Sequence, residues 1–509
     1  MSRRGRGRKQ PGVASSSHQR KVNYRQLQNH LIKQPAFSED RLEAMHQTAL
    51  RVLNELGIKV LNDEARHLFR QAGLKTDEAT QMVHIDPEIV SASLDSAPSE
   101  FTLHGATPLN DVKLGGNNIA FVPAGGAPHI SDLDDGKRPG SIEHTRNVIR
   151  LTEHFDVIHL QSPNVESQDI PVHLRHYQVT EAQLTLSHKP FFIFSRGSGQ
   201  VADAFQMARI ARGLSESEFE AKPWCYTVIN TNSPRQLDIP MCQGIIDFAR
   251  AGQPSVITPF TLAGAMAPVT MAGALVLQHA EALSGIVLSQ LVRKGAPVVY
   301  GSFTSNVDMK SGSPAFGTPE SVQAAFGAGQ LARHIQLPWR GSSATASNIA
   351  DEQSMYEFMM SAWGSVLGGV NMMLHAAGWL EGGLTVSMEK FILDVEVLQT
   401  FAEIFDPLKS NDAELAFDAI ASVDPGGHFF GCDHTMERYE TAFYDPLVSD
   451  WSNFGQWTDN GSLTAAKRAN GIWKKILQDF EPPAMDQSNA EALQAFIDKR
   501  TAEGGAPID

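Results

Sequence analysis

Eight short apolar runs recur along residues 119–378, and their spacing is the feature that most restricts the fold of this chain. Successive runs start 38, 34, 34, 30, 42, 41 and 33 residues apart. Most are apolar on both faces, as expected of parallel strands that are buried on both sides. Amphipathic helical patterns fill the gaps between them. The runs begin near Ile119, Val157, Phe191, Cys225, Ser255, Pro297, Pro338 and Asn371.

This alternation predicts an α/β protein built as a (β/α)8 TIM barrel. An open doubly wound sheet is the alternative. No GxGxxG or GxxxxGK(S/T) loop follows a run, so neither a dinucleotide-binding fold nor a P-loop is supported. We expect a disordered basic tail over 1–21, a helical N-terminal extension over 22–118 and the barrel over 119–381. A helical C-terminal region over 382–509 follows, with a lid loop at 424–435.

The charge balance argues against a nucleic-acid partner. The chain has 57 acidic and 42 basic residues, which gives a net charge of −15. Seven basic residues lie in the first 21, so the remainder has 35 basic against 57 acidic residues, a balance of −22. A body this acidic repels phosphate. The tail is compatible with a nucleic-acid arm or a targeting signal, but it lacks the apolar core of a secretory signal, and we expect a solvated tail.

Cysteine spacing and uncharged stretches indicate the compartment. Cys225, Cys242 and Cys432 lie far apart, which predicts free thiols in a reducing cytoplasm. Residues 251–280 and 358–380 contain no charged residue, but polar residues, glycines or prolines interrupt both. We therefore expect core segments, no membrane partner and a cytoplasmic protein.

The carboxyl ends of the predicted strands, where a barrel places its active site, are rich in polar and aromatic residues. No HExxH or GxSxG motif occurs in the chain, and we expect no bound metal. Aromatic faces attract quaternary ammonium groups through cation–π interactions. His375, Trp379 and Glu381 share the segment HAAGWLEGG, which favours a functional role for this loop. The candidate substrate-binding residues are Phe260, Phe303, Asn306, Trp379, Ser343, His428 and Phe429.

Three long strings resemble the trimethylamine methyltransferase family, whose members depend on a corrinoid. They are YGSFTSNVDMKSGSPAFGTPE (300–320), HAAGWLEGGLTVSMEKFILDVE (375–396) and GGHFFGCDHT (426–435). The resemblance implies a TIM barrel with helical additions. It also implies transfer of a methyl group from a methylamine or quaternary amine to the Co(I) form of cobalamin or a related corrinoid on a separate corrinoid protein.

One departure from the family pattern bears on the substrate. Trimethylamine-specific members carry pyrrolysine in a segment that corresponds to GSSATASNIADEQSMYE (341–357), where this chain has standard residues. Members without pyrrolysine demethylate quaternary amines such as glycine betaine. The resemblance thus implies Glu381, His375 and Asp308 as catalytic residues, with a carboxylate near the cation. A betaine carboxylate would bind Arg196, Arg340 or the backbone near 341–343.

We therefore predict a corrinoid-dependent methyltransferase that acts on a small quaternary amine similar to glycine betaine. The chain contains no DxHxxG signature, so the corrinoid arrives on a partner protein or free. Alternatives are a trimethylamine methyltransferase proper, a barrel that binds methylated amines without catalysis, and another barrel enzyme such as a lyase for choline-like amines. A homo-oligomer is a further expectation.

Overall fold

A curled parallel sheet forms the centre of the computed structural model, which describes residues 23–507. The predicted tail over 1–21 lies outside these residues. Seven strands run parallel in the order β7-β19-β18-β15-β13-β11-β10, and β1 (Leu27–Gln28) pairs antiparallel with β7 at one edge. The parallel strands are β7 (Asn118–Phe121), β10 (Phe191–Phe192), β11 (Cys225–Ile229), β13 (Ser255–Ile257), β15 (Val298–Gly301), β18 (Trp339–Ser342) and β19 (Met372–Leu374).

The second predicted strand, the run that begins at Val157, is wrong as a strand assignment. Residues 157–163 form no regular strand, although their backbone N–H groups form hydrogen bonds to the segments on both sides. The His159 N–H donates to the Phe121 carbonyl of β7, and the Gln161 N–H donates to the Pro190 carbonyl just before β10, both at 2.9 Å. The His159 ring takes a ladder position, since its Nδ1 accepts the Phe121 N–H at 3.0 Å. A side chain therefore replaces a backbone carbonyl, which interrupts the strand pattern.

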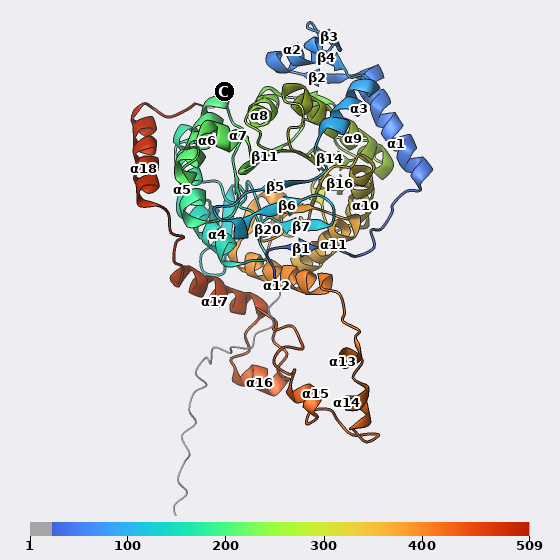
Figure 1. Ribbon diagram of the computed structural model, residues 1–509, viewed down its shortest axis with the longest axis vertical. Helices are drawn as coiled ribbons and strands as arrows, with labels where there is room; N and C mark the ends of the chain where they lie inside the picture. The colour runs from blue at the N-terminus through green and yellow to red at the C-terminus, as the bar shows by residue number, and fades with distance from the viewer. Residues whose placement is uncertain (1–22, 508–509) are drawn as a thin grey trace, which may run out of the picture. The chain divides into compact units, whose positions relative to one another are not determined.

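Helices follow the strands and surround the sheet, as the sequence predicts (Figure 1). Thr318 caps α10 by accepting the Ser321 N–H, and Pro319 occupies the first turn, where its missing N–H costs nothing. α9 is long and apolar enough to span a membrane, but 72% of its most apolar window is buried, as in a core helix. The helices are α4 (Ile142–His154), α5 (Val172–Leu186), α6 (Ser198–Arg212), α7 (Glu216–Glu220), α8 (Ile239–Arg250), α9 (Met271–Val292), α10 (Pro319–His334) and α11 (Glu352–Gly368).

The sheet encloses an apolar core made from alternate residues of the strands. One cluster includes Phe192, Tyr226, Val256, Val299 and Met372, which come from five different strands. Their neighbours in sequence, such as Ile193 and Cys225, belong to a second cluster shared with α6. This division follows from the two-residue period of a strand, which points successive side chains to opposite faces.

The N-terminal extension combines helices with small sheets. The helices are α1 (Glu39–Arg51), which continues as a π-helix (Val52–Leu56), α2 (Asp63–Gln71) and α3 (Pro87–Ser96). Strands β2 (Ile58–Val60), β3 (Lys75–Asp77) and β4 (Met82–His84) form a sheet with β12 (Gln236–Leu237), and β5 (Phe101–Leu103) pairs with β6 (Val112–Leu114). β12 follows β11 of the central sheet, so the extension is tied to a strand-end loop.

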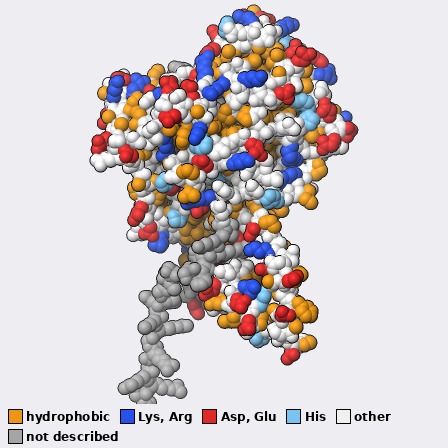
Figure 2. Space-filling view, viewed as in Figure 1, with side chains coloured by type: hydrophobic (Ala, Val, Ile, Leu, Met, Phe, Trp, Pro, Cys, Tyr) orange, Lys and Arg blue, Asp and Glu red, His pale blue; other side chains and the backbone are white. Residues whose placement is uncertain are grey.

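The C-terminal region divides between two units. α12 (Met388–Phe405), α17 (Ala465–Gln478) and α18 (Gln487–Ala502) belong to the unit of the central sheet, and α18 is fixed to α6 by Arg500 and Asp203 at 3.0 Å. Residues 406–447 form the second unit, with α13 (Asp412–Leu415), α14 (Phe417–Ala421) and α15 (Asp433–Met436). Its exposed apolar side chains include Leu408, Phe417, Phe430 and Phe443. On the face in Figure 2, acidic and basic side chains are interspersed.

Candidate active site

The loops after β13 and β15 extend the carboxyl ends of these strands with a second layer of β-structure. β14 (Phe260–Ala263) and β16 (Phe303–Val307) pair in parallel, and β17 (Pro314–Ala315) pairs antiparallel with β16. The register places Phe260 opposite Phe303, and their ring centroids are 4.9 Å apart. The extra strands therefore fix two predicted substrate-binding rings side by side.

Five rings gather here, and we call Phe260, Phe303, Phe316, His375 and Trp379 the aromatic cluster. The Phe303 ring lies 4.9 Å from His375 and stacks on Phe316 at 5.2 Å. Trp379 lies 3.7 Å from the His375 ring and 6.3 Å from Phe303. Phe260 and Phe303 are partly exposed, whereas the other three are buried. Two rings of the cluster are therefore partly accessible to solvent, and the other three are buried beside them.

His375 is held in a strained backbone conformation at the end of β19. Its φ of 63° is left-handed, which is uncommon outside glycine and is found at functional sites. Its Nδ1 lies 2.7 Å from the Ser342 hydroxyl, and its Nε2 lies 3.4 Å from the guanidinium of Arg340. Burial and the neighbouring Arg340 hold the pKa of His375 well below its ordinary value, so the ring is neutral at pH 7.

Arg340 lies on β18 directly beneath the cluster and is 2% exposed. Its Nη1 donates to the Ser302 carbonyl at 2.9 Å, and its guanidinium carbon lies 5.1 Å from the Phe303 ring centroid. Its Nε has no hydrogen-bond partner. Burial lowers the pKa of Arg340 to about 9, and its hydrogen bonds and contacts within residues 23–507 include no carboxylate.

The two acidic residues predicted to be catalytic lie in different environments. Glu381 bonds Lys137 at 2.5 Å and the Thr385 hydroxyl at 2.7 Å. Burial raises the pKa of Glu381, but these hydrogen bonds outweigh it and keep the pKa below its ordinary value. Asp308 accepts the hydroxyl of Ser311, which lowers its pKa, and so closes its own exposed turn.

The other predicted binding residues do not join the aromatic cluster directly. Ser343 is buried, with its hydroxyl 3.4 Å from the Leu374 carbonyl. Asn306 accepts the Thr318 hydroxyl at 3.0 Å. His428 and Phe429 belong to the 406–447 unit, where Phe429 is 45% exposed.

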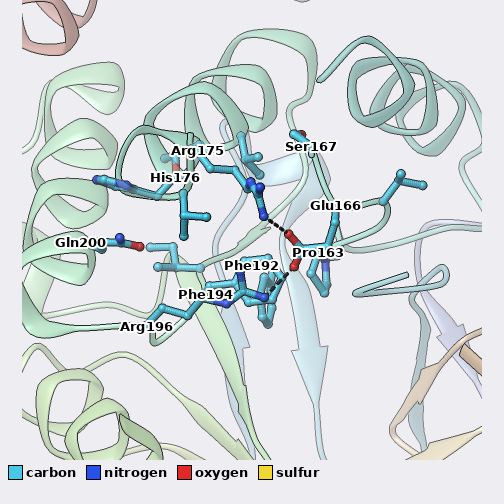
Figure 3. A pocket seen from close by; sticks show the side chains of 14 residues that line it. Pro163, Glu166, Ser167, Arg175, His176, Phe192, Phe194, Arg196 and Gln200 are labelled. Carbon is cyan, nitrogen blue, oxygen red and sulfur yellow. Dashed lines mark hydrogen bonds and ion pairs between the residues drawn. The ribbon is translucent and has the colours of Figure 1, made fainter. Parts of the chain in front are cut away.

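A second group of charged residues, after the second and third runs, lines a pocket that we call the Glu166 pocket. Arg175 of α5 and Arg196 bind the two carboxylate oxygens of Glu166 from opposite sides, at 2.7 and 2.5 Å (Figure 3). Arg196 also covers the Phe194 ring at 4.2 Å. Both arginines are neutralised in part by an internal carboxylate.

Several residues of the site escaped the sequence reasoning. Phe316 lies in the same loop as Asn306, and Ser342 adjoins Ser343, but neither has a pattern that distinguishes it from its neighbours. Glu166 follows a run that is not a strand. Arg340, by contrast, was named from the sequence as one of the residues that could bind a substrate carboxylate.

Comparisons with known proteins place this geometry in context. The family model described as trimethylamine methyltransferase matches residues 2–505. A glycine betaine methyltransferase of Desulfitobacterium hafniense (strain Y51) is 36% identical over 477 residues, which cover 93% of this chain and 99% of that protein. A trimethylamine methyltransferase MttB of Desulfitobacterium hafniense (strain DSM 10664 / DCB-2) is 31% identical over 471 residues, covering 92% and 94%.

The fold also has a counterpart among solved structures. The monomethylamine methyltransferase MtmB of Methanosarcina barkeri aligns with a TM-score of 0.52 at 10% identity, over 92% of this chain and 88% of that chain. At this identity the likeness concerns the fold alone.

Proposed function

Because the chain belongs to the trimethylamine methyltransferase family and is a methyltransferase, we propose that it moves a methyl group from a quaternary amine to the Co(I) of a corrinoid protein. The observation that carries this proposal is the aromatic cluster at the carboxyl ends of the strands. Each aromatic face stabilises a desolvated cation by about 0.5–2 kcal/mol. The neutral His375 adds no like charge beside that cation.

We infer that the strand layout is a closed (β/α)8 barrel in which residues 157–163 take the second position. The backbone bonds from His159 to β7 and from Gln161 to the segment before β10 support this closure. In that barrel the aromatic cluster lies at the mouth, where a bulky acceptor reaches the partly exposed rings of Phe260 and Phe303.

Methyl transfer from a quaternary amine requires no strong acid or base in the site. When the methyl group of a quaternary amine leaves, the electron pair of its C–N bond stays on nitrogen, and the product is a neutral tertiary amine. No proton is required for this departure, whereas a tertiary amine must first be activated. A corrinoid in the Co(I) state supplies the nucleophile. We propose that this chain binds and orients the cation and excludes water from it.

We assign the predicted catalytic residues as follows. His375 forms part of the wall and holds Ser342 and Arg340 in place. Glu381 stays ionised on the Trp379 loop, but its ion pair with Lys137 offsets part of the negative potential that it adds beside the cation. The contacts of Asp308 with its own turn give no support to a catalytic role.

The methyl acceptor, the cellular location, the lid and the oligomeric state are also proposals. We propose a separate corrinoid protein as methyl acceptor, a cytoplasmic location, and the loop at 424–435 as a lid. The exposed apolar side chains of the 406–447 unit support a homo-oligomer that covers them. Sedimentation of the purified chain as a monomer would contradict the oligomer.

Methylation of cob(I)alamin tests the function directly. The full chain is mixed with cob(I)alamin and glycine betaine or trimethylamine, and the change in corrinoid absorbance is followed. We expect methyl transfer from glycine betaine only, and a loss of about 30-fold in kcat/KM for Trp379→Ala, which removes one face. Trp451→Ala, at a site 72% exposed, is the matched control and should change nothing. Transfer from trimethylamine alone would favour the alternative, and transfer from neither would overturn the proposal.

A further inference from the structure

The guanidinium of Arg340 is a buried cation that forms no ion pair with a carboxylate of residues 23–507. Its side chain points to the interior of the sheet, on the same face of β18 as Ser342, whereas Gly341 between them faces outward. Within residues 23–507 one other arginine is buried, Arg66, which is 5% exposed, and it binds the carboxylates of Asp63 and Glu78. Because burial of an unpaired charge is costly, we expect Arg340 to bind an anionic ligand that pairs its charge.

The free part of this guanidinium has a defined geometry. Nη1 is used by the Ser302 carbonyl, while Nε has no partner and Nη2 has only the 3.4 Å contact with His375. Nε and Nη2 form one edge of the planar guanidinium, the edge that binds both oxygens of a carboxylate. A carboxylate on that edge would replace the long His375 contact and displace the side chains that cover Nε, which is itself buried.

We propose that Arg340 anchors the carboxylate of the substrate, so that the enzyme acts on betaines, in which a quaternary ammonium and a carboxylate are close neighbours. The identity of the cationic part rests on the proposed function. Trp379 and His375 beside the anchor are buried, and Phe260 and Phe303 are partly exposed. The carboxylate therefore lies deep and the methylated nitrogen lies outward, under the rings, where a methyl group faces the acceptor.

Arg196 is the competing anchor, and its contacts argue against it. Its guanidinium already binds Glu166 at 2.5 Å, and the same carboxylate is shared with Arg175. A substrate carboxylate placed there would meet the negative charge of Glu166. Figure 3 shows that both arginines point to Glu166.

Calorimetric titration of the full chain tests the anchor without methyl transfer. The ligands are glycine betaine and tetramethylammonium, which keeps the cation but lacks the carboxylate. We expect the wild type to bind glycine betaine at least about 30-fold more tightly, since loss of one partner of a buried charge pair has about this effect. Arg340→Gln should abolish the preference, Arg340→Lys should reduce it, and Arg196→Gln should retain it.

Three results would overturn the proposal: equal binding of both ligands by the wild type, a preference that survives in folded Arg340→Gln, or a preference lost in Arg196→Gln. Circular dichroism verifies folding, and Arg340→Lys serves if Arg340→Gln does not fold. The proposed function fails separately. If the Arg340-dependent preference is present but cob(I)alamin is not methylated, the role of Arg340 is supported and the proposed methyl transfer is contradicted. If methylation occurs without an Arg340-dependent preference, the anchor alone falls.

Discussion

The aromatic cluster and the Glu166 pocket both have arginine beside them, but the charge of that arginine is balanced in only one of the two regions. In the Glu166 pocket, one internal carboxylate binds two arginines whose side chains are 18% and 35% exposed. Beneath the aromatic cluster, Arg340 is more deeply buried and has no carboxylate. In the Glu166 pocket the arginine charges are balanced without a ligand, whereas the charge of Arg340 is not balanced. The comparison supports Arg340, rather than Arg196, as the proposed site for an anion from outside.

The largest effect is expected from removal of the shared carboxylate. Glu166→Gln leaves Arg175 and Arg196 close together without a counter-ion, and we expect the free energy of unfolding to fall by about 2–4 kcal/mol. Glu143→Gln removes an exposed carboxylate that binds Arg150 at 2.7 Å, and it should cost less than about 1 kcal/mol. Urea denaturation measures both. Equal losses would show that the Glu166 pocket is not held by its charges.

Removal of the Arg340 charge is expected to have the opposite effect on the free energy of unfolding. Arg340→Met keeps the length of the apolar stem and removes an unpaired buried charge, so we expect the free energy of unfolding to stay unchanged or to rise by about 1 kcal/mol. Denaturation without ligand provides the measurement. A loss of 2 kcal/mol or more, roughly the effect expected when a satisfied buried partner is removed, would show that Arg340 serves the fold rather than a ligand.

The smallest effect concerns pH and His176, which lines the Glu166 pocket. Burial lowers the pKa of His176 from 6.5 to about 4, against the opposing effect of Asp203. Between these values the unfolded chain binds a proton that the folded chain does not. His176 therefore lowers stability as the pH falls from about 6.5 to about 4, by up to about 1.4 kcal/mol per pH unit.

His176→Phe should remove this part of the acid sensitivity and leave stability at pH 7 nearly unchanged, because neither ring nitrogen has a hydrogen bond. Urea denaturation at pH 7, 6 and 5 compares the variant with the wild type. Parallel profiles of the two proteins would contradict the assignment.

The sequence was enough to predict most of the parallel strands, because each lies in a run that is apolar on both faces. It was also enough to predict helices in the gaps between the runs, such as α10 (Pro319–His334) between the sixth and seventh runs. It failed at residues 157–163, where the His159 ring bonds the β7 backbone. Such a replacement depends on a partner 38 residues away in the chain and leaves no mark on local periodicity.

The candidate site was predicted in part. Phe260, Phe303, His375 and Trp379 come together because they follow β13, β15 and β19, whose carboxyl ends lie at the same edge of the sheet. The pairing of β14 with β16 was not foreseen, since neither strand has a distinctive pattern. The bonds of Glu381 to Lys137 and of Asp308 to its own turn depend on loop conformation, which strand order does not determine.

A crystal structure of the chain with glycine betaine is the most direct test of the account. We predict that the carboxylate binds the Nε and Nη2 edge of Arg340 and that the trimethylammonium group lies against Phe303 and Trp379. A ligand in the Glu166 pocket, or one whose carboxylate points away from Arg340 to solvent, would contradict it.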